Sequence, residues 1–304
     1  MSQSRPESKP ESKPKSRAEL QQSPEDAVSL PIEPLNPDIS ARLRSLTPAR
    51  VGLRRSGSSI ATSELLDFQL SHARARDAVH APLQPSTLLP PLSAILKSCQ
   101  DPTTEILVLH SAAKDRQTYL QRPDLGRKLD EPSQKRLHER PQCPCDLAIL
   151  IADGLSALAV ERNAVALISA LLPLLSASLP ELRIAPISLV EQARVAIGDE
   201  IAHGLHANLA IVLIGERPGL SSPDSLGAYI TWQPRPGITS DAERNCISNI
   251  RAEGLSYPQA AARLLHYIQE ARSKRLTGVA LKDPDTDSGR LELSTGTALE
   301  AKDR

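Results

Sequence analysis

Aromatic residues are scarce in this sequence, at 2% of 304 residues, with one Phe, one Trp and four Tyr. A buried core must therefore rely on Leu, Ile, Val and Ala, within an overall hydrophobic fraction of 40%. Cysteine is rare too. Four residues over this length do not make a disulfide framework, which favours a reducing compartment. The length suits one large domain or two modest ones.

An excess of one charge sign is also missing, because 36 basic and 36 acidic residues cancel. Nucleic acids and anionic membranes select clustered basic surfaces, so we expect neither as the main partner. No uninterrupted apolar run approaches the roughly 20 residues that span a bilayer. The opening segment MSQSRPESKPESKPKSR lacks the apolar core of a secretory signal, and a cytoplasmic protein is therefore predicted.

The composition divides the chain into four regions. Residues 1–45 are rich in Ser, Pro, Lys and Glu, which predicts a disordered tail, and a targeting or tethering role stays open. Residues 46–140 form a helical N-terminal region, and residues 146–282 an α/β domain. Residues 283–304 are polar and predict a loose C-terminal tail.

Regular elements are expected in both central regions. The apolar spacing predicts a helix over 62–80, capped by Thr62 or Ser63. Four prolines between 82 and 91 predict a loop before a second helix and a short strand, at 92–99 and 105–110. From residue 146, apolar runs predict strands that alternate with helices: strands 147–151, 184–190, 209–214 and 228–232, and helices 157–179, 192–204 and 257–272. This order predicts an α/β fold with a mostly parallel sheet flanked by helices, Rossmann-like in its C-terminal part.

Ligands of open α/β sheets bind beyond the carboxyl ends of the strands. Three segments are candidates there: 151–156, 214–227 and 243–250. In the second, Glu216 and Arg217 leave a buried strand between glycines, which fits either a ligand contact or a tight turn with a surface ion pair. In the first, Asp153 fits a ribose or metal contact, or more commonly a helix cap. No G-x-G-x-x-G or P-loop motif follows any strand.

Other reactive side chains do not form a recognisable set. Cys143 and Cys145 lack a second pair, which favours a structural or incidental role. Cys246 lies close to Arg244 in the sequence. A thiol near a cation can be reactive, but Cys246 is also consistent with a small buried side chain. His203 and His206 lack a third ligand and are expected at the surface. The residues therefore predict ligand binding without identifying a reaction.

Long segments resemble one family, the small (light) chain of ethanolamine ammonia-lyase. They are RVGLRRSGSSIATSELLDFQLSHARARDAVH (50–80), YLQRPDLGRKL (119–129), ADGLSALAVERNA (152–164), IGERPGLSSPDSLGAYITWQPRPG (214–237) and ERNCISNI (243–250). The resemblance implies conversion of ethanolamine to acetaldehyde and ammonia by radical chemistry with adenosylcobalamin. It also implies a large-subunit partner with a TIM barrel, which holds the substrate, and a hetero-oligomer of paired chains in which the small chain closes over the cobalamin and its region 46–140 packs on the partner.

The resemblance also implies the cofactor contacts, which are Val195, Glu216 and Cys246. Glu216 would accept amide N–H groups of the corrin rim, Val195 would offer apolar contact, and Cys246 a small polarizable surface. Cys246 is not expected to bind cobalt, and no catalytic or metal-ligating residue is expected in this chain. The tails and the linker 131–144 depart from the family pattern.

Two alternatives from other classes stay open. One is a stand-alone α/β nucleotide-binding protein, against which the missing glycine-rich phosphate loop argues. The other is a purely structural partner of the large chain that never meets the cofactor. The resemblance further implies a bacterial microcompartment where the organism has one, and composition does not decide whether the N-terminal tail addresses the chain to it.

Overall fold

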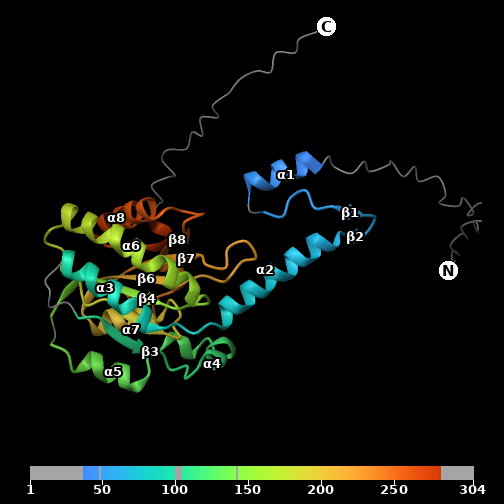
Figure 1. The fold of residues 1–304 in the computed structure, drawn as a ribbon. Helices are drawn as coiled ribbons and strands as arrows, with labels where there is room; N and C mark the ends of the chain where they lie inside the picture. Colours follow the sequence, from blue (N-terminus) through green and yellow to red (C-terminus); the bar gives the residue numbers. More distant parts are fainter. Residues whose placement is uncertain (1–36, 48, 100–104, 142, 282–304) are drawn as a thin grey trace, which may run out of the picture. The chain divides into compact units, whose positions relative to one another are not determined.

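The computed structural model describes residues 37–47, 49–99, 105–141 and 143–281, and it divides into two units at Ala61–Thr62. The expected C-terminal tail lies outside the described residues, as does most of the expected disordered segment 1–45. The end of that segment is helical, however, because helix α1 spans Pro37–Leu46. The first unit also holds a small antiparallel ribbon of β1 (Arg55–Ser56) and β2 (Ser59–Ile60) (Figure 1).

A six-stranded sheet in the order β3-β5-β4-β6-β7-β8 forms the centre of the second unit. Its strands are β3 (Leu107–His110), β4 (Cys145–Ala152), β5 (Ser188–Glu191), β6 (Ala207–Gly215), β7 (Leu226–Trp232) and β8 (Arg244–Ile250). The first four strands of the sheet order are parallel, whereas β7 and β8 are antiparallel additions. The predicted mostly parallel α/β fold is therefore confirmed. The segment 243–250 was expected only as a loop-like site segment, and most of it is the edge strand β8.

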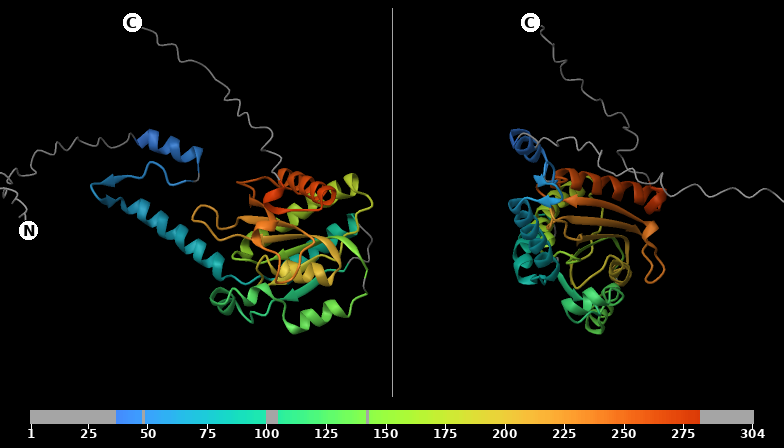
Figure 2. Two further views of the ribbon diagram at one scale, coloured as in Figure 1. Left: turned by 180° about the vertical axis from the view of Figure 1, so that it is seen from behind. Right: turned by 90° about the vertical axis from the view of Figure 1, so that its right-hand side faces the viewer.

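Helices cover both faces of the sheet. Helices α3 (Pro85–Cys99), α6 (Ala157–Ser178) and α8 (Tyr257–Lys274) pack on one face, and α5 (Glu131–His138) and α7 (Ile197–Gly204) on the other (Figures 1 and 2). Alternate residues of β4 explain both layers: Leu147, Ile149 and Ile151 join the first core, and Ala148, Leu150 and Ala152 the second. Both cores are almost entirely aliphatic, as the scarcity of aromatics requires.

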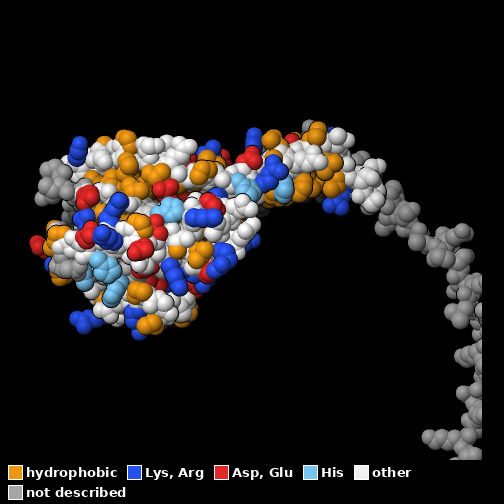
Figure 3. Space-filling view, turned by 90° about the horizontal axis from the view of Figure 1, so that it is seen from below, with side chains coloured by type: hydrophobic (Ala, Val, Ile, Leu, Met, Phe, Trp, Pro, Cys, Tyr) orange, Lys and Arg blue, Asp and Glu red, His pale blue; other side chains and the backbone are white. Residues whose placement is uncertain are grey.

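The remaining helices lie near the start of the second unit, between its strands and after α8. They are α2 (Thr62–His80) and α4 (Arg116–Gln121), with short 3-10 turns η2 (Leu125–Arg127), η3 (Asp241–Glu243) and η4 (Gly278–Ala280). On the face seen from below, basic and acidic side chains are interspersed, in keeping with the balanced composition (Figure 3). Among the described residues, α6 is the one helix long and apolar enough to cross a membrane. Half of that stretch is buried inside the protein.

Several predicted boundaries were wrong for local physical reasons. Helix α3 begins at Pro85 and continues through Pro90 and Pro91, where a loop was expected. The two prolines remove N–H donors, but the side chains of Leu88, Leu92 and Leu96 follow one face and are buried in the core. The predicted strand 184–190 shortens to β5, since Ile184 forms only an isolated bridge. The expected linker 131–144 contains α5, whose N-cap Asp130 accepts a hydrogen bond from the Ser133 N–H at 2.9 Å.

The helix predicted over 192–204 was also wrong at its start, and this difference shapes the site. Helix α7 begins only at Ile197, and residues 192–196 form a loop after β5. Gln192 has a φ of 55°, a left-handed conformation that ends the strand and cannot begin a right-handed helix. The loop follows the carboxyl end of β5 and carries Val195.

Candidate functional site

A pocket of about 400 Å³ opens at the carboxyl ends of β4 and β6. This is the edge where ligands of open α/β sheets bind. Two of the predicted contact residues, Val195 and Glu216, both line the pocket. Its full lining comes from five separate segments: Tyr119, Gly154, Leu155, Arg194, Val195, Ile214, Gly215, Glu216, Arg217 and Tyr229.

The third predicted residue, Cys246, lies beside the pocket rather than in its lining. It stands opposite Tyr229 in the β7–β8 register, and the two side chains are hydrogen-bonded. Tyr229 itself lines the pocket. The fold therefore brings the three predicted residues to one region, with the exposed Cys246 beside Tyr229.

The loop that carries Val195 is held in place by Asp153. The two carboxylate oxygens accept hydrogen bonds from the N–H groups of Gln192 and Ala193, each at 2.9 Å. Asp153 has no exposed surface, and Ser156 is the actual cap of α6, accepting from the Ala159 N–H at 3.2 Å. The interpretation of Asp153 as a helix cap was thus wrong, and the structure supports no ribose or metal contact. Its function here is to position the loop.

A buried arginine compensates the charge of Asp153. Arg116 Nη1 lies 3.3 Å from the carboxylate and donates to the Gly154 carbonyl at 2.8 Å. Burial nevertheless dominates and raises the pKa of Asp153 to about 6, although the backbone N–H groups and Arg116 oppose the shift. Burial also lowers the pKa of Arg116. This pair fixes the turn between β4 and α6 against the loop after β5.

Tyr119 forms the floor of the pocket between two guanidinium groups. Those of Arg116 and Arg194 lie 4.8 and 4.4 Å from the ring centroid. The Tyr119 hydroxyl donates to the Ala193 carbonyl at 3.0 Å, and the Arg194 N–H donates to the Gly126 carbonyl at 2.8 Å. A Cβ at Gly126 would lie 2.9 Å from the tyrosine ring, so the close approach requires glycine. The backbone of every residue from Gln192 to Arg194 is therefore held by at least one hydrogen bond.

Sequence reasoning missed Asp153, Arg116 and Tyr119 as parts of the site's framework. Their positions in the chain are separated by turns and helices, and only the fold brings them together. Two signals were available, because Tyr119 and Asp153 lie in the segments 119–129 and 152–164 that resemble the family. These signals marked the segments without indicating what the two side chains contact.

Glu216 leaves β6 through a very close backbone contact. A Cβ at Gly215 would lie 2.0 Å from the Ser156 carbonyl oxygen, so this turn admits only glycine. The Glu216 carboxylate accepts hydrogen bonds from the hydroxyls of Ser225 and Ser248, each at 2.5 Å, and from the Asn249 N–H at 3.3 Å. A carboxylate offers about four acceptor positions. One position therefore remains for a ligand, on a side chain that is already oriented.

Cys246 does not have the environment of a reactive thiol. Partial desolvation raises the pKa of the thiol, the Tyr229 hydrogen bond opposes this, and the charge of Glu216 raises the pKa further. The neighbouring Arg244 is engaged elsewhere, with its guanidinium 2.7 and 2.8 Å from the two oxygens of the buried Asp199. Burial also raises the pKa of Tyr229. Both groups are neutral at neutral pH and offer shape and weak hydrogen bonds.

The other candidate reactive groups stay apart from the pocket. Cys143 is exposed and Cys145 half-buried, and both are free thiols. His203 and His206 are exposed, as predicted. Within the described ranges there is no group of three or more His, Cys, Asp or Glu side chains that would hold a metal ion. The Ser156 hydroxyl donates to the Pro223 carbonyl at 2.8 Å, so it serves the turn rather than a nucleophilic site.

These features define an α/β protein with a hydrogen-bonded pocket wall at the carboxyl edge of its sheet, and no nucleophile–base pair is assembled among the lining residues. The model of the ethanolamine ammonia-lyase light chain (EutC) family matches residues 37–282. This chain belongs to the ethanolamine ammonia-lyase light chain family.

Individual relatives agree with the family match over most of both chains. The ethanolamine ammonia-lyase small subunit of Pseudomonas fluorescens (strain Pf0-1) is 52% identical over 274 residues, covering 89% of this chain and 95% of the relative. That of Azotobacter vinelandii is 54% identical over 245 residues, covering 80% and 87%. That of Xanthomonas campestris pv. campestris (strain ATCC 33913) is 50% identical over 270 residues, covering 88% and 94%.

Proposed function

We propose that this chain is the small subunit of an adenosylcobalamin-dependent ethanolamine ammonia-lyase. Together with a large subunit it converts ethanolamine to acetaldehyde and ammonia, and its own part is to close over the cofactor. The observation that carries the proposal is the convergence of Val195 and Glu216 on one pocket, with Cys246 beside the pocket residue Tyr229. The family membership and the absence of an assembled catalytic set in the described pocket support this division of labour.

The pocket suits one edge of a large, amide-rimmed cofactor. Bound adenosylcobalamin supplies the radical chemistry. Glu216 has one free acceptor position for an amide N–H, held in direction by two serine hydroxyls. Val195 provides an apolar contact from the loop that Asp153 and Tyr119 hold. A pocket of about 400 Å³ takes only part of a corrin, which fits a cofactor shared with a second chain.

The helical N-terminal region supplies a surface for that second chain. Helix α2 leaves four large apolar side chains 42–58% exposed: Leu65, Leu66, Phe68 and Leu70. Its buried positions are instead Glu64, Ala75 and Ala78, so the leucines do not serve the chain's own core. Large exposed apolar side chains in a cluster favour a protein interface. We assign α2 to contact with the large subunit, in the cytoplasm and in a microcompartment where the organism has one.

The proposal is tested by cobalamin binding to the complex of this chain with its large subunit, followed by the visible spectrum of the corrin. Glu216→Gln replaces an acceptor oxygen by an amide NH2 group that faces hydroxyl and N–H donors. We expect binding to weaken by about tenfold or more. Glu181→Gln, at an exposed position between α6 and β5, is the matched control and should bind as the unaltered complex does.

The substitution Cys246→Ser distinguishes between two roles of Cys246, a contact to the cofactor and a reactive thiol. A contact role predicts binding and turnover within about threefold of the unaltered protein, since the side chains are nearly isosteric. Abolished turnover with intact cofactor binding would contradict the assignment of Cys246. Unchanged binding in Glu216→Gln would contradict the assignment of the pocket, even if the family membership stands.

A further inference from the structure

A second and larger cavity, of about 690 Å³, lies at the opposite edge of the sheet. It opens where β6 begins and β7 ends, and it shares no lining residue with the pocket that holds Val195 and Glu216. We call it the basic groove, after the residues that give it its chemistry: His203, His206, Trp232, Arg235, Arg275 and Thr277.

The free side chains of the groove are hydrogen-bond donors. In the described part of the chain, no hydrogen bond or ion pair engages the side chains of His203, His206 or Arg275, and all three are exposed. The one acidic lining residue, Glu243, is already occupied. It lies 3.2 Å from Arg235 and accepts from the Ser240 N–H at 2.7 Å. Arg275 therefore presents an unpaired positive charge and the two histidines add ring N–H donors, a combination that suits an anion.

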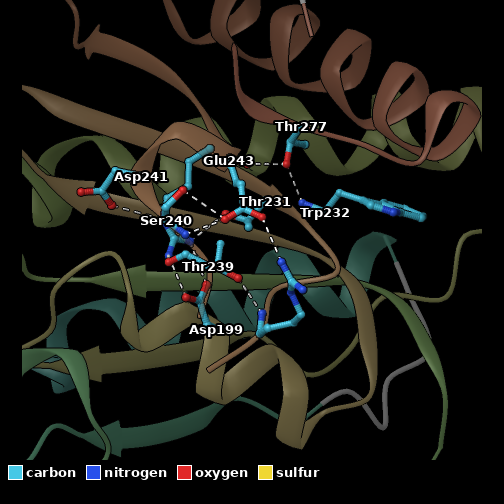
Figure 4. Close-up of polar contacts among 10 residues, drawn as sticks. Asp199, Thr231, Trp232, Thr239, Ser240, Asp241, Glu243 and Thr277 are labelled. Atoms are coloured by element: carbon cyan, nitrogen blue, oxygen red, sulfur yellow. Dashed lines mark hydrogen bonds and ion pairs between the residues drawn. The ribbon is translucent and has the colours of Figure 1, made fainter. Parts of the chain in front are cut away.

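The wall of the groove is rigid before any ligand arrives (Figure 4). The Thr277 hydroxyl accepts a hydrogen bond from the backbone N–H of Trp232 at 2.8 Å and donates one to the backbone carbonyl of Glu243 at 2.6 Å. The Thr239 hydroxyl accepts from the Arg235 N–H at 2.7 Å. Beneath this wall, the buried Arg244–Asp199 pair anchors β8 to α7. A wall held this way loses little further freedom when a ligand binds.

Backbone strain is concentrated around the groove. Five non-glycine residues in the described ranges have left-handed φ angles, and three of them line it: His206 at 52°, Gln233 at 42° and Arg275 at 56°. Such conformations cost free energy, and residues held in them cluster at functional sites. Here they bend the chain at the start of β6, at the end of β7 and at the end of α8, which are the three segments that frame the groove.

The single tryptophan of the sequence, Trp232, also lies in this groove. It is half-buried, and its side chain extends away from the Asp199 and Asp241 cluster (Figure 4). An indole ring offers a flat apolar face together with one N–H donor. Next to arginine and histidine donors, it suits a ligand that combines a planar ring with an anionic group.

We propose that the basic groove binds an organic phosphate with a planar ring, of the nucleoside monophosphate class. Arg275, His203 and His206 hold the phosphate, and Trp232 contacts the ring. The site is distinct from the proposed cobalamin pocket, so its occupation does not depend on that assignment.

The test uses the fluorescence of Trp232, which reports on the groove alone because the full-length chain has no other tryptophan. AMP is titrated with excitation at a wavelength selective for tryptophan, and adenosine and inorganic phosphate are titrated separately. We expect saturable quenching by AMP, with each of the two fragments binding about tenfold or more weakly. AMP binding should weaken about fivefold or more in Arg275→Asn. Asparagine is chosen because it tolerates the left-handed backbone conformation of this position.

Arg272→Gln, in the last turn of α8 and outside the groove, is the matched control and should bind AMP normally. Circular dichroism establishes that each variant is folded. No saturable response to AMP, or equal responses in Arg275→Asn and the unaltered chain, would overturn the proposal. Inorganic phosphate binding as tightly as AMP would overturn the role of Trp232.

Equilibrium dialysis of labelled AMP repeats the comparison on the complex with the large subunit. Binding by the complex that Arg275→Asn weakens supports the proposal in the assembled protein. Binding by the chain but not by the complex would overturn it, since the groove would then belong to a subunit interface.

Discussion

Asp153 holds the wall of the proposed cofactor pocket without lining the pocket itself. It binds the two N–H groups that precede Arg194, and it does so from a fully buried position. The positions of the lining residues Arg194 and Val195 therefore depend on Asp153, which does not line the pocket. A conservative change behind the wall should disturb binding as a change in the wall does.

The raised pKa of Asp153 gives a pH dependence with a definite sign. The carboxyl is protonated more readily in the folded state, at a pKa of about 6, than at its ordinary value of 3.8. Between these values the folded state binds the additional proton, so the free energy of unfolding falls as pH rises. We predict that the stability advantage of the unaltered chain over Asp153→Asn decreases between about pH 4 and pH 6, by about 3 kcal/mol at most.

Denaturant unfolding of both proteins at several pH values measures this difference, and titrating groups common to both cancel. A constant difference across this range would mean that Asp153 titrates normally. A difference that grows with pH would contradict the sign.

Two glycines with left-handed backbone conformations differ in the space around them. Substituting each by alanine distinguishes the free-energy cost of steric crowding from that of backbone strain. Gly154 has a φ of 56°, and a Cβ there would lie 2.3 Å from the Gly215 carbonyl oxygen. Gly237 has a φ of 71° with no atom within 4 Å of the added Cβ. We predict that Gly237→Ala costs about 1–2 kcal/mol from strain alone, and Gly154→Ala at least about 1–3 kcal/mol more from overpacking. Thermal unfolding compares the two, and equal costs would refute the crowded turn beside the pocket.

At the scale of whole elements, helix α2 carries the proposed subunit contact. Leu66→Gln with Leu70→Gln removes two side chains that are 58% and 51% exposed. The free energy of unfolding of the chain alone should change by no more than about 0.5 kcal/mol, because neither side chain is in the core. Association with the large subunit should weaken by about tenfold or more.

Ile238→Gln, at a loop position 66% exposed, is the matched control for that experiment. Titration of the large subunit against each labelled variant gives the affinities. Unchanged association of the α2 variant would remove this helix from the interface. A loss that Ile238→Gln reproduces would point to a general effect of surface polarity.

The sequence allowed prediction of elements where one local signal dominated. Continuous apolar runs predicted β4 and β6, and the helix predicted over 257–272 is α8. Predictions failed where tertiary contacts overrode local preference. The buried leucines of α3 outweigh two prolines, and Asp153 diverts the N–H groups of residues 192–193 from helix formation. The antiparallel β8 was missed because its polar edge residues hide the strand pattern.

The candidate site was predictable in part, for a similar reason. Glu216 was marked by its position after an apolar strand, while Val195 and Cys246 came only from the family resemblance. The framework of Asp153, Arg116 and Tyr119 depends on contacts between residues up to 76 positions apart, the separation between Arg116 and Gln192. Local spacing patterns in the sequence do not predict contacts between residues this far apart.

At the scale of the whole molecule, the family match begins at residue 37 and ends at residue 282. Residues 1–36 and 283–304 fall outside it. We predict that a chain trimmed to 37–282 keeps turnover within about twofold in the complex, since Val195, Glu216 and Cys246 are all retained. Steady-state kinetics of the trimmed and full-length complexes test this. A large loss would assign the tails a part in catalysis or assembly.

The most direct test of the central proposal is acetaldehyde release from ethanolamine, measured with and without adenosylcobalamin. The assay compares this chain alone, the large subunit alone, and the two co-expressed. The account predicts activity from the pair only, and only with the cofactor. Activity from the large subunit alone, or a co-purifying pair that stays inactive with the cofactor, would contradict it.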